Sequence, residues 1–178
     1  MYDGVTVPYL TRYYDNTLVC YSYSKSLSLP GERIGYIVIP DRLADYKKVS
    51  PAIAGAARVL GFVCAPSLFQ QVAARCVEDT GDIEAYKSNR DLLLKGLTSL
   101  GYTCVPPQGA FYLFVKALEE DADAFCERAK KYDLLLVPSD DFGCPGYVRI
   151  AYCVAQKTIV DAMPAFGKLM EEYSAAVS

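Results

Sequence analysis

One lysine, one arginine and several serines lie close together between two strand-like segments of the sequence. The stretch Ser22–Tyr36 has the sequence SYSKSLSLPGERIGY, with Lys25 and Arg33 as its two cations. Fixed positive charges beside small hydroxyl groups suit a phosphate, because guanidinium and hydroxyl donors match its oxygens. A lysine in a serine-rich loop is also compatible with a plain solvated side chain. Ser22, Lys25 and Arg33 are therefore candidate anion-binding residues.

Two predicted strands position these residues. Residues 17–23 and 33–39 are rich in β-branched and aromatic side chains and are bounded by turn formers, as strands are. Pro30 and Gly31 rule out a continuous helix between them, so we expect a loop that contains Lys25. Lys25 and Arg33 should then lie near the same end of the two strands.

The full pattern S-x-S-K-x(5)-G-x-R-x-G-Y resembles the cofactor-lysine segment of the class I/II aminotransferases. These are fold type I enzymes that use pyridoxal 5'-phosphate, and the likeness is to members of the aspartate aminotransferase type. The resemblance implies that Lys25 is the catalytic residue and forms an internal Schiff base with the cofactor aldehyde. It also implies that Ser22 and Arg33 hold the cofactor phosphate. The residue types suit these roles, since a neutral lysine amine condenses with an aldehyde whereas an arginine keeps its charge.

A further candidate is Arg149, in a predicted strand over residues 147–153. Alternate residues of a strand face opposite sides, so we expect Arg149 to share a face with Tyr147 and Ala151, away from the core. A guanidinium among apolar neighbours needs an anion, an internal ion pair or an edge strand from which it can reach water. The segment G-x-V-R-I-A, with Phe142 shortly before it, is similar to the family's C-terminal motif, whose arginine binds the substrate α-carboxylate.

The resemblance implies amino group transfer between an amino acid and a 2-oxo acid, carried out by a cytoplasmic homodimer. Family subunits are more than twice as long as this chain, and the match is to their C-terminal portion. The aspartate that pairs with the cofactor ring would lie upstream of Met1. We therefore expect a truncated chain that neither holds pyridoxal phosphate tightly nor transaminates alone. Two alternatives stay open: a related pyridoxal-phosphate lyase or synthase, and a non-catalytic interaction module.

Composition excludes several other functions. The 178 residues carry a net charge of −3 with interspersed charges, which disfavours nucleic acid as a partner. No apolar run approaches the length of a membrane span. The sequence has no histidine, which excludes histidine-based catalysis, and its seven cysteines form no C-x-x-C pair, so no metal site is predicted. We expect the cysteines to be reduced core residues of a cytoplasmic protein.

The predicted fold is α/β, the C-terminal part of the fold type I architecture. Residues 1–45 would be a two-strand remnant of the large cofactor-binding domain, and residues 46–178 would hold interdomain helices and a mostly antiparallel small domain covered by helices. Within this outline residues 1–16 are expected to be a loop. The other expected elements are a helix over 41–60 interrupted by Pro51, a helix from a Ser67–Gln70 capping box, a helix over 83–100 capped by Gly101, a hairpin of 102–105 with 110–115, a helix over 121–132, strands at 134–137 and 147–153, and a helix over 156–174 kinked or restarted at Pro164.

Overall fold

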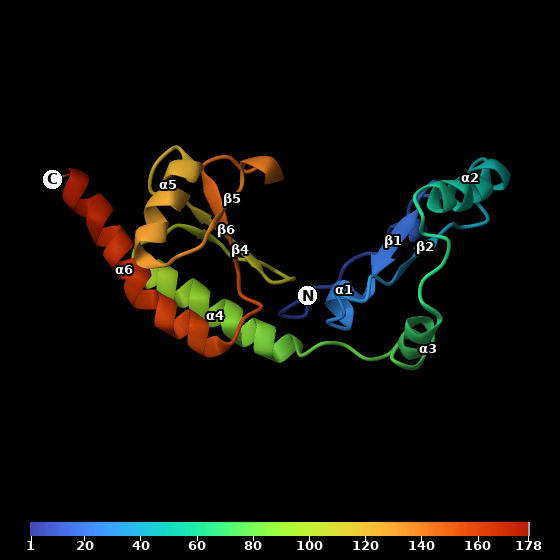
Figure 1. The fold of residues 1–178 in the computed structure, drawn as a ribbon, viewed down its shortest axis with the longest axis horizontal. Coiled ribbons are helices and arrows are strands. Elements are labelled where there is room, and N and C mark those ends of the chain that lie inside the picture. The colour runs from blue at the N-terminus through green and yellow to red at the C-terminus, as the bar shows by residue number, and fades with distance from the viewer. Residues whose placement is uncertain (178) are drawn as a thin grey trace. The chain divides into compact units, whose positions relative to one another are not determined.

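The computed structural model describes residues 1–177, and these form two compact units (Figure 1). Residues 6–81 make up one unit, here called the lysine unit because it contains Lys25. Met1–Val5 together with the chain from Asp82 onward make up the other, called the arginine unit because it contains Arg149. The functional division predicted at residue 45 is a different one and stays a prediction.

The lysine unit is built on a two-stranded antiparallel ribbon, which confirms the two predicted strands. Val19 pairs with Val38 and Ser22 with Gly35. The pairing is close at Gly35, where a Cβ atom would lie 2.3 Å from the Tyr21 carbonyl oxygen, so only glycine fits. The elements of this unit are η1 (Leu10–Arg12), β1 (Val19–Ser22), α1 (Tyr23–Ser26), β2 (Gly35–Val38), α2 (Tyr46–Val59) and α3 (Ser67–Arg75).

The predicted interruption at Pro51 and the predicted restart at Pro164 are both absent. Helix α2 continues through Pro51, and α6 (Gln156–Val177) continues through Pro164. A proline inside a helix leaves the carbonyl four residues earlier without its usual partner. Lys47 and Val160, which supply those carbonyls, are both exposed residues. Water at the exposed faces can therefore replace the missing hydrogen bonds.

The predicted capping box at Ser67–Gln70 is wrong. The N-cap of α3 is Pro66, which makes no side-chain cap hydrogen bond, and Ser67 is already helical. The Gln70 side chain instead donates from Nε2 to the Ala65 carbonyl oxygen at 2.6 Å. In and just after this helix Leu68 and Val77 are more than 60% exposed, whereas Ala73 is buried.

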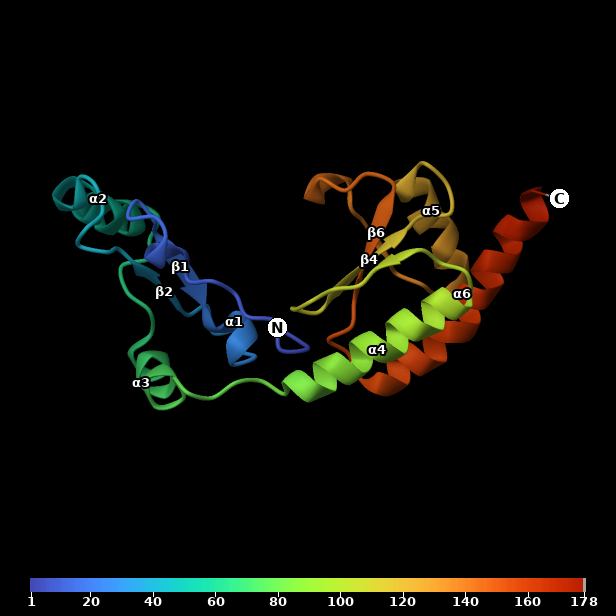
Figure 2. The ribbon, with the colours of Figure 1, turned by 180° about the vertical axis from the view of Figure 1, so that it is seen from behind.

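The arginine unit holds a four-stranded antiparallel sheet in the order β3-β4-β6-β5. Helices α4 and α6 lie side by side, as both ribbon views show (Figures 1 and 2). The hairpin of β3 with β4 and the final helix confirm the predicted small domain, although β5 begins three residues later than expected. The elements are α4 (Ile83–Ser99), β3 (Cys104–Val105), β4 (Tyr112–Lys116), α5 (Ala122–Ala129), η2 (Lys130–Tyr132), β5 (Val137–Pro138), η3 (Asp140–Phe142), β6 (Tyr147–Ala151) and α6.

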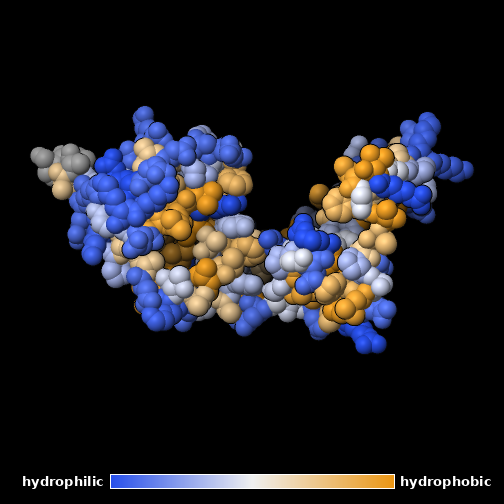
Figure 3. Space-filling view, in the orientation of Figure 1, coloured by the Kyte–Doolittle hydropathy of each residue, from blue (hydrophilic) through white to orange (hydrophobic). Residues whose placement is uncertain are grey.

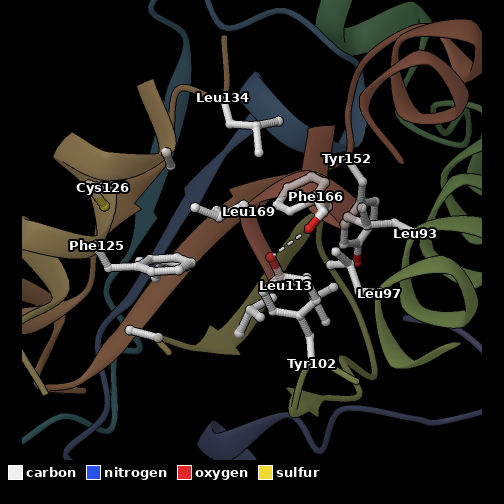
Figure 4. Close-up of a cluster of buried hydrophobic side chains, with 14 of the residues drawn as sticks. Leu93, Leu97, Tyr102, Leu113, Phe125, Cys126, Leu134, Tyr152, Phe166 and Leu169 are labelled. Atoms are coloured by element: carbon white, nitrogen blue, oxygen red, sulfur yellow. Dashed lines mark hydrogen bonds between the residues drawn. The ribbon is translucent and has the colours of Figure 1, made fainter. Parts of the chain in front are cut away.

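One hydrophobic core joins the helices of the arginine unit to one face of its sheet (Figure 4). Leu97 of α4, Leu113 of β4 and Leu169 of α6 have no exposed surface. The Tyr102 hydroxyl is buried with them and donates to the Phe166 carbonyl oxygen at 3.0 Å, so its polar group is satisfied. Burial raises the pKa of Tyr102 well above its usual value. This core fixes the sheet to its helices.

Gly101 ends α4 as predicted. It has a φ of +94°, its N–H donates to the Thr98 carbonyl, and the Tyr102 N–H donates to the Leu97 carbonyl. These two bonds form a Schellman motif, with Leu97 and Tyr102 both in the core. The helix end and the start of the hairpin are therefore set by one turn.

The first 16 residues form the loop that was predicted, apart from the short turn η1, and Met1–Val5 of this loop are anchored in the arginine unit. Tyr2 is only 4% exposed, and its N–H donates to the Gln108 carbonyl oxygen at 2.9 Å. Asp3 forms ion pairs with Arg90 at 2.8 Å and with Lys87 at 3.1 Å. Hydrogen bonds from Arg90 and then Lys87 lower the pKa of Asp3. The Tyr2 hydroxyl also donates to the Ala110 carbonyl oxygen. A buried tyrosine with two hydrogen bonds and an aspartate with two ion pairs thus hold the segment in place.

The lysine unit leaves much of its apolar surface exposed. Val59, the last residue of α2, is 88% exposed, and Leu60 and Phe62 just after the helix are 71% and 73% exposed. Apolar side chains are visible on the surface of this unit in Figure 3.

The cysteines differ in exposure. Cys126 is buried, but Cys20, Cys64 and Cys153 are exposed. The prediction that the cysteines are core residues is wrong for these three.

The core of the arginine unit makes a direct prediction about stability. Leu97→Ala should lower the free energy of unfolding by about 2–5 kcal/mol, because it removes a fully buried side chain and leaves a cavity. Leu135→Ala is the matched control, since Leu135 is 83% exposed, and it should change stability by less than about 0.5 kcal/mol. Urea unfolding followed by circular dichroism measures both. Equal effects of the two substitutions would contradict this account of the core.

Candidate active site

Lys25 lies on α1, a single helical turn that begins directly after β1, and not in the predicted loop. The turn forms because Ser22 caps it: the Ser22 Oγ accepts a hydrogen bond from the Ser24 N–H at 3.2 Å. The same Oγ donates to the Ser24 Oγ at 2.9 Å. Lys25 and Ser22 are both exposed. The Ser-x-Ser-Lys sequence therefore builds its own helical turn, which sets the direction in which the lysine leaves the ribbon.

Arg33 lies at the same end of the ribbon as Lys25, as predicted. Ser22 pairs with Gly35, and the Tyr23 N–H at the start of α1 donates to the Ile34 carbonyl oxygen at 3.1 Å. The Arg33 backbone is left-handed, with a φ of +51°. Its Nη1 donates to the Pro30 carbonyl oxygen at 2.9 Å, which ties the guanidinium to the turn that precedes it.

Three tyrosine rings pack together beside this segment. The rings of Tyr21 and Tyr36 stack at 5.0 Å, and the Tyr23 ring meets them edge-on at 5.3 and 5.8 Å. Burial and then the neighbouring Tyr23 and Tyr21 raise the pKa of Tyr36. Sequence reasoning missed this tyrosine cluster. The signal was present, because Tyr21 and Tyr36 are cross-strand partners in the register that places Ser22 opposite Gly35.

A pocket of about 810 Å³ within the lysine unit adjoins Arg33. Its other lining residues include Tyr36, Phe62 and Phe69, so its wall is mainly apolar, and Glu32 lines it beside Arg33. Lys25 does not line it, and so this pocket alone does not unite the two cations.

The donor set of the segment is chemically suited to pyridoxal phosphate. Ser22 and Ser24 place two hydroxyl groups within 2.9 Å of each other at the start of α1. Arg33, at the same end of the ribbon, adds a guanidinium, and Lys25 supplies a primary amine one residue beyond Ser24. Hydroxyl and guanidinium donors match a phosphate, and the amine matches an aldehyde.

Arg149 lies on β6, an inner strand of the sheet, with β4 on one side and β5 on the other. It pairs with Phe114 of β4 and with Val137 of β5. Val148 and Tyr152 are fully buried, whereas Arg149 is half-buried on the opposite face. The predicted alternation is confirmed. Because β6 is not an edge strand, the predicted alternative in which the Arg149 side chain reaches water from an edge strand is excluded.

Two aromatic rings contact the Arg149 guanidinium. Its Cζ atom lies 4.3 Å from the centre of the Tyr112 ring and 4.0 Å from the centre of the Phe142 ring. Within residues 1–177 no carboxylate forms an ion pair with Arg149, so the predicted alternative of an internal ion pair is wrong for the described chain. Cation–π contacts with Tyr112 and Phe142, which sequence reasoning did not assign to this residue, take its place.

The predicted site residues thus fall into two groups. Ser22, Lys25 and Arg33 lie at one end of the β1–β2 ribbon in the lysine unit, and Arg149 lies in the arginine unit. Their joint membership of a single active site stays a prediction.

The sequence also matches a known family model. The model for aminotransferase class I and II matches residues 3–166, which includes both the lysine segment and the Arg149 strand. The chain belongs to this family. Its fold agrees: a crystal structure of an aminotransferase from Eubacterium rectale is 62% identical, with a TM-score of 0.92 over 97% of this chain and 43% of that one.

More distant relatives give the same result. The aspartate/prephenate aminotransferase of Thermus thermophilus is 29% identical over 160 residues, which is 88% of this chain and 41% of that protein. The aromatic-amino-acid aminotransferase 2 of Thermococcus litoralis is 28% identical over 97% of this chain and 46% of its own. A Thermus thermophilus aspartate aminotransferase variant in complex with tryptophan has a TM-score of 0.78 at 28% identity, covering 94% of this chain and 45% of that one.

The chain therefore spans less than half the length of these relatives. The predicted fold class, the C-terminal part of the fold type I architecture, is confirmed by these structural matches. None of the helices in the described part of the chain has the length and hydropathy that a membrane crossing needs.

The close pairing at Gly35 predicts how the lysine segment can be disrupted. Gly35→Ala would place a Cβ atom against the Tyr21 carbonyl and should destabilise the ribbon by about 1–3 kcal/mol. Gly31→Ala is the control, because a Cβ atom at Gly31 meets nothing within 4 Å. Hydrogen exchange of the Val19–Ser22 amides should speed up in the first variant and stay unchanged in the second. Unchanged exchange in both would show that this register is wrong.

Proposed function

We propose that this chain supplies Lys25, Ser22, Arg33 and Arg149 to a pyridoxal-phosphate-dependent aminotransferase. The reaction moves an amino group between an amino acid and a 2-oxo acid. The observation that carries the proposal is the family match over residues 3–166, which contains the complete lysine pattern and the Arg149 strand together. Each residue has a role that its chemistry and position support.

Pyridoxal phosphate, when bound, supplies an aldehyde for the amino group and a ring that accepts electrons. Lys25 is the candidate catalytic residue, because in its neutral form Nζ can accept a proton from the substrate α-carbon and return it. Its place on α1 supports this role, since a capped helical turn holds the lysine backbone more firmly than an open loop would.

Ser22 and Arg33 are the candidate phosphate-binding residues. A hydroxyl and a guanidinium at one end of a ribbon offer donors to different oxygens of the same anion. Arg33 donates one hydrogen bond to the Pro30 carbonyl, which limits its freedom before any ligand arrives. Its remaining N–H groups are available for a phosphate.

Arg149 is the candidate substrate-binding residue. A guanidinium and a carboxylate form two parallel hydrogen bonds, which fix both the position and the orientation of the substrate. The half-buried place of Arg149 on an inner strand strengthens such a pair, because fewer water molecules compete for it.

We further propose that the enzyme is a homodimer. The exposed apolar run Val59, Leu60 and Phe62 in the lysine unit supports this, since extended apolar surface of this kind favours a protein partner. We assign the enzyme to the cytoplasm, a reducing compartment in which the exposed Cys20, Cys64 and Cys153 stay as thiols.

Chemical trapping tests the role of Lys25. Borohydride reduction of an enzyme that contains this chain, after addition of pyridoxal phosphate, should fix the cofactor on Lys25, as peptide mass spectrometry would show. Lys25→Ala should abolish trapping and reduce amino group transfer by at least about 10³-fold. Lys95→Ala changes an exposed lysine of the arginine unit and should leave both unchanged. Trapping at another lysine would refute the assignment, and release of free ammonia without formation of a new amino acid from the acceptor 2-oxo acid would favour a lyase.

The 178-residue chain by itself should not transaminate. It spans less than half the length of its relatives, and in this family we expect further cofactor contacts from outside it. The purified chain, incubated with pyridoxal phosphate, aspartate and 2-oxoglutarate, should form no glutamate above the rate of free cofactor. Turnover that depends on Lys25 would show that the chain is sufficient.

A further inference from the structure

The sheet of the arginine unit has a second face, opposite the helices, with Arg149 at its centre. Phe114 of β4 and Tyr147 of β6 are half-buried on this face, as is Tyr112. The face is therefore aromatic, with a guanidinium in the middle. This arrangement lies entirely within the arginine unit.

The Arg149 guanidinium lies over two aromatic rings. Its Cζ atom is 4.3 Å from the centre of the Tyr112 ring and 4.0 Å from the centre of the Phe142 ring, well inside the range of a cation–π contact. A guanidinium carries its N–H donors in its own plane and is weakly hydrated above and below. Rings that stack on a guanidinium cover its faces, and its edge is then the direction from which an anion can approach.

Backbone geometry fixes both rings. Phe114 is the direct partner of Arg149, so Tyr112 is its diagonal neighbour on the same face. Phe142 lies in a tight turn that begins at Ser139. The N–H groups of Phe142 and Cys144 both donate to the Ser139 carbonyl oxygen at 3.0 Å. Gly143, with a φ of +71°, completes this turn. Phe142 is 50% exposed and is nevertheless held over the guanidinium.

We propose that Tyr112 and Phe142 are positioning residues that hold Arg149 for edge-on binding of a flat carboxylate. The inference rests on the proposed role of Arg149 in substrate binding. A carboxylate lies in the guanidinium plane and meets neither ring, whereas a tetrahedral anion such as a phosphonate carries oxygens above and below that plane. The two rings thus favour carboxylates over tetrahedral anions, and they remove side-chain freedom that Arg149 would otherwise lose on binding.

Nuclear magnetic resonance of the 178-residue chain tests the inference with propionate and ethylphosphonate as probes. Ring currents from Tyr112 and Phe142 should shift the Arg149 Nε–H proton upfield. Phe142→Leu keeps apolar bulk but removes the ring, so the proton should move downfield. Propionate binding should weaken by about 3–10-fold, and its preference over ethylphosphonate should fall. Tyr112→Leu should act in the same direction, and Phe142→Tyr, which keeps a ring, should restore all three properties to within about twofold.

Leu135→Ala, at a position that is 83% exposed, is the control and should match the unmodified chain. Wild-type values of the proton shift and of propionate affinity in Phe142→Leu and Tyr112→Leu would overturn the inference. So would a Phe142→Tyr variant that behaves like Phe142→Leu.

Arg149→Gln separates this inference from the proposed function. Loss of propionate binding in Arg149→Gln, with normal binding in both ring variants, would leave the role of Arg149 intact and refute the role of the rings. Equal propionate binding by Arg149→Gln and the unmodified chain would refute the role of Arg149. The Nε–H shift in the unmodified chain would then still report whether the rings cover the guanidinium.

Discussion

The pairing of β4 with β6 is the interaction on which the arginine unit depends. It places Leu113, Val115 and Val148 on one face, where the helices bury them almost completely. Because strand residues alternate, the same pairing puts Arg149 on the opposite face, beside Tyr112 and Phe114. A slip of one residue in β6 would exchange the faces and bury a guanidinium in the core. The energy of core packing therefore also determines where the cation lies.

The lysine unit uses the same principle with far less buried area. Its ribbon has four pairs of residues, and few of its side chains are buried: Thr11, Ile34, Leu43 and Ala73. Local interactions therefore contribute more to the stability of this unit. Examples are the Ser22 cap on α1 and the hydrogen bond from the Tyr23 N–H to the Ile34 carbonyl oxygen. An isolated two-stranded ribbon is marginal in water, so contacts with the residues around this ribbon matter for its stability.

Much of the fold could be predicted from the sequence where short-range rules agree with burial. The two ribbon strands, the Gly101 cap and the alternation around Arg149 all follow from residue types within a few positions of each other. The errors arose where a local rule was outweighed. Pro51 does not interrupt α2 because an exposed helix can lose one hydrogen bond to water. The Ser67 cap fails because Pro66 is the N-cap and Ser67 is already the first helical residue.

The candidate site shows the same limit. The residue types at Ser22, Lys25 and Arg33 pointed to an anion, and the family resemblance supplied their roles. Contacts between segments distant in the sequence could not be predicted. No local sequence pattern indicates that Phe142 lies over Arg149 or that Tyr2 is buried beside Arg90. Such contacts depend on how turns and strands come together in three dimensions. The resemblance to a family does not replace that information.

The tyrosine cluster beside Lys25 has a practical consequence. The chain contains 15 tyrosines and no tryptophan, so its near-ultraviolet signals arise mainly from phenol rings. Stacked rings such as Tyr21 and Tyr36 couple their electronic transitions, and coupled transitions give stronger circular dichroism than isolated ones. Near-ultraviolet dichroism is thus an intrinsic optical probe, with no added label, of whether the segment around Lys25 is ordered.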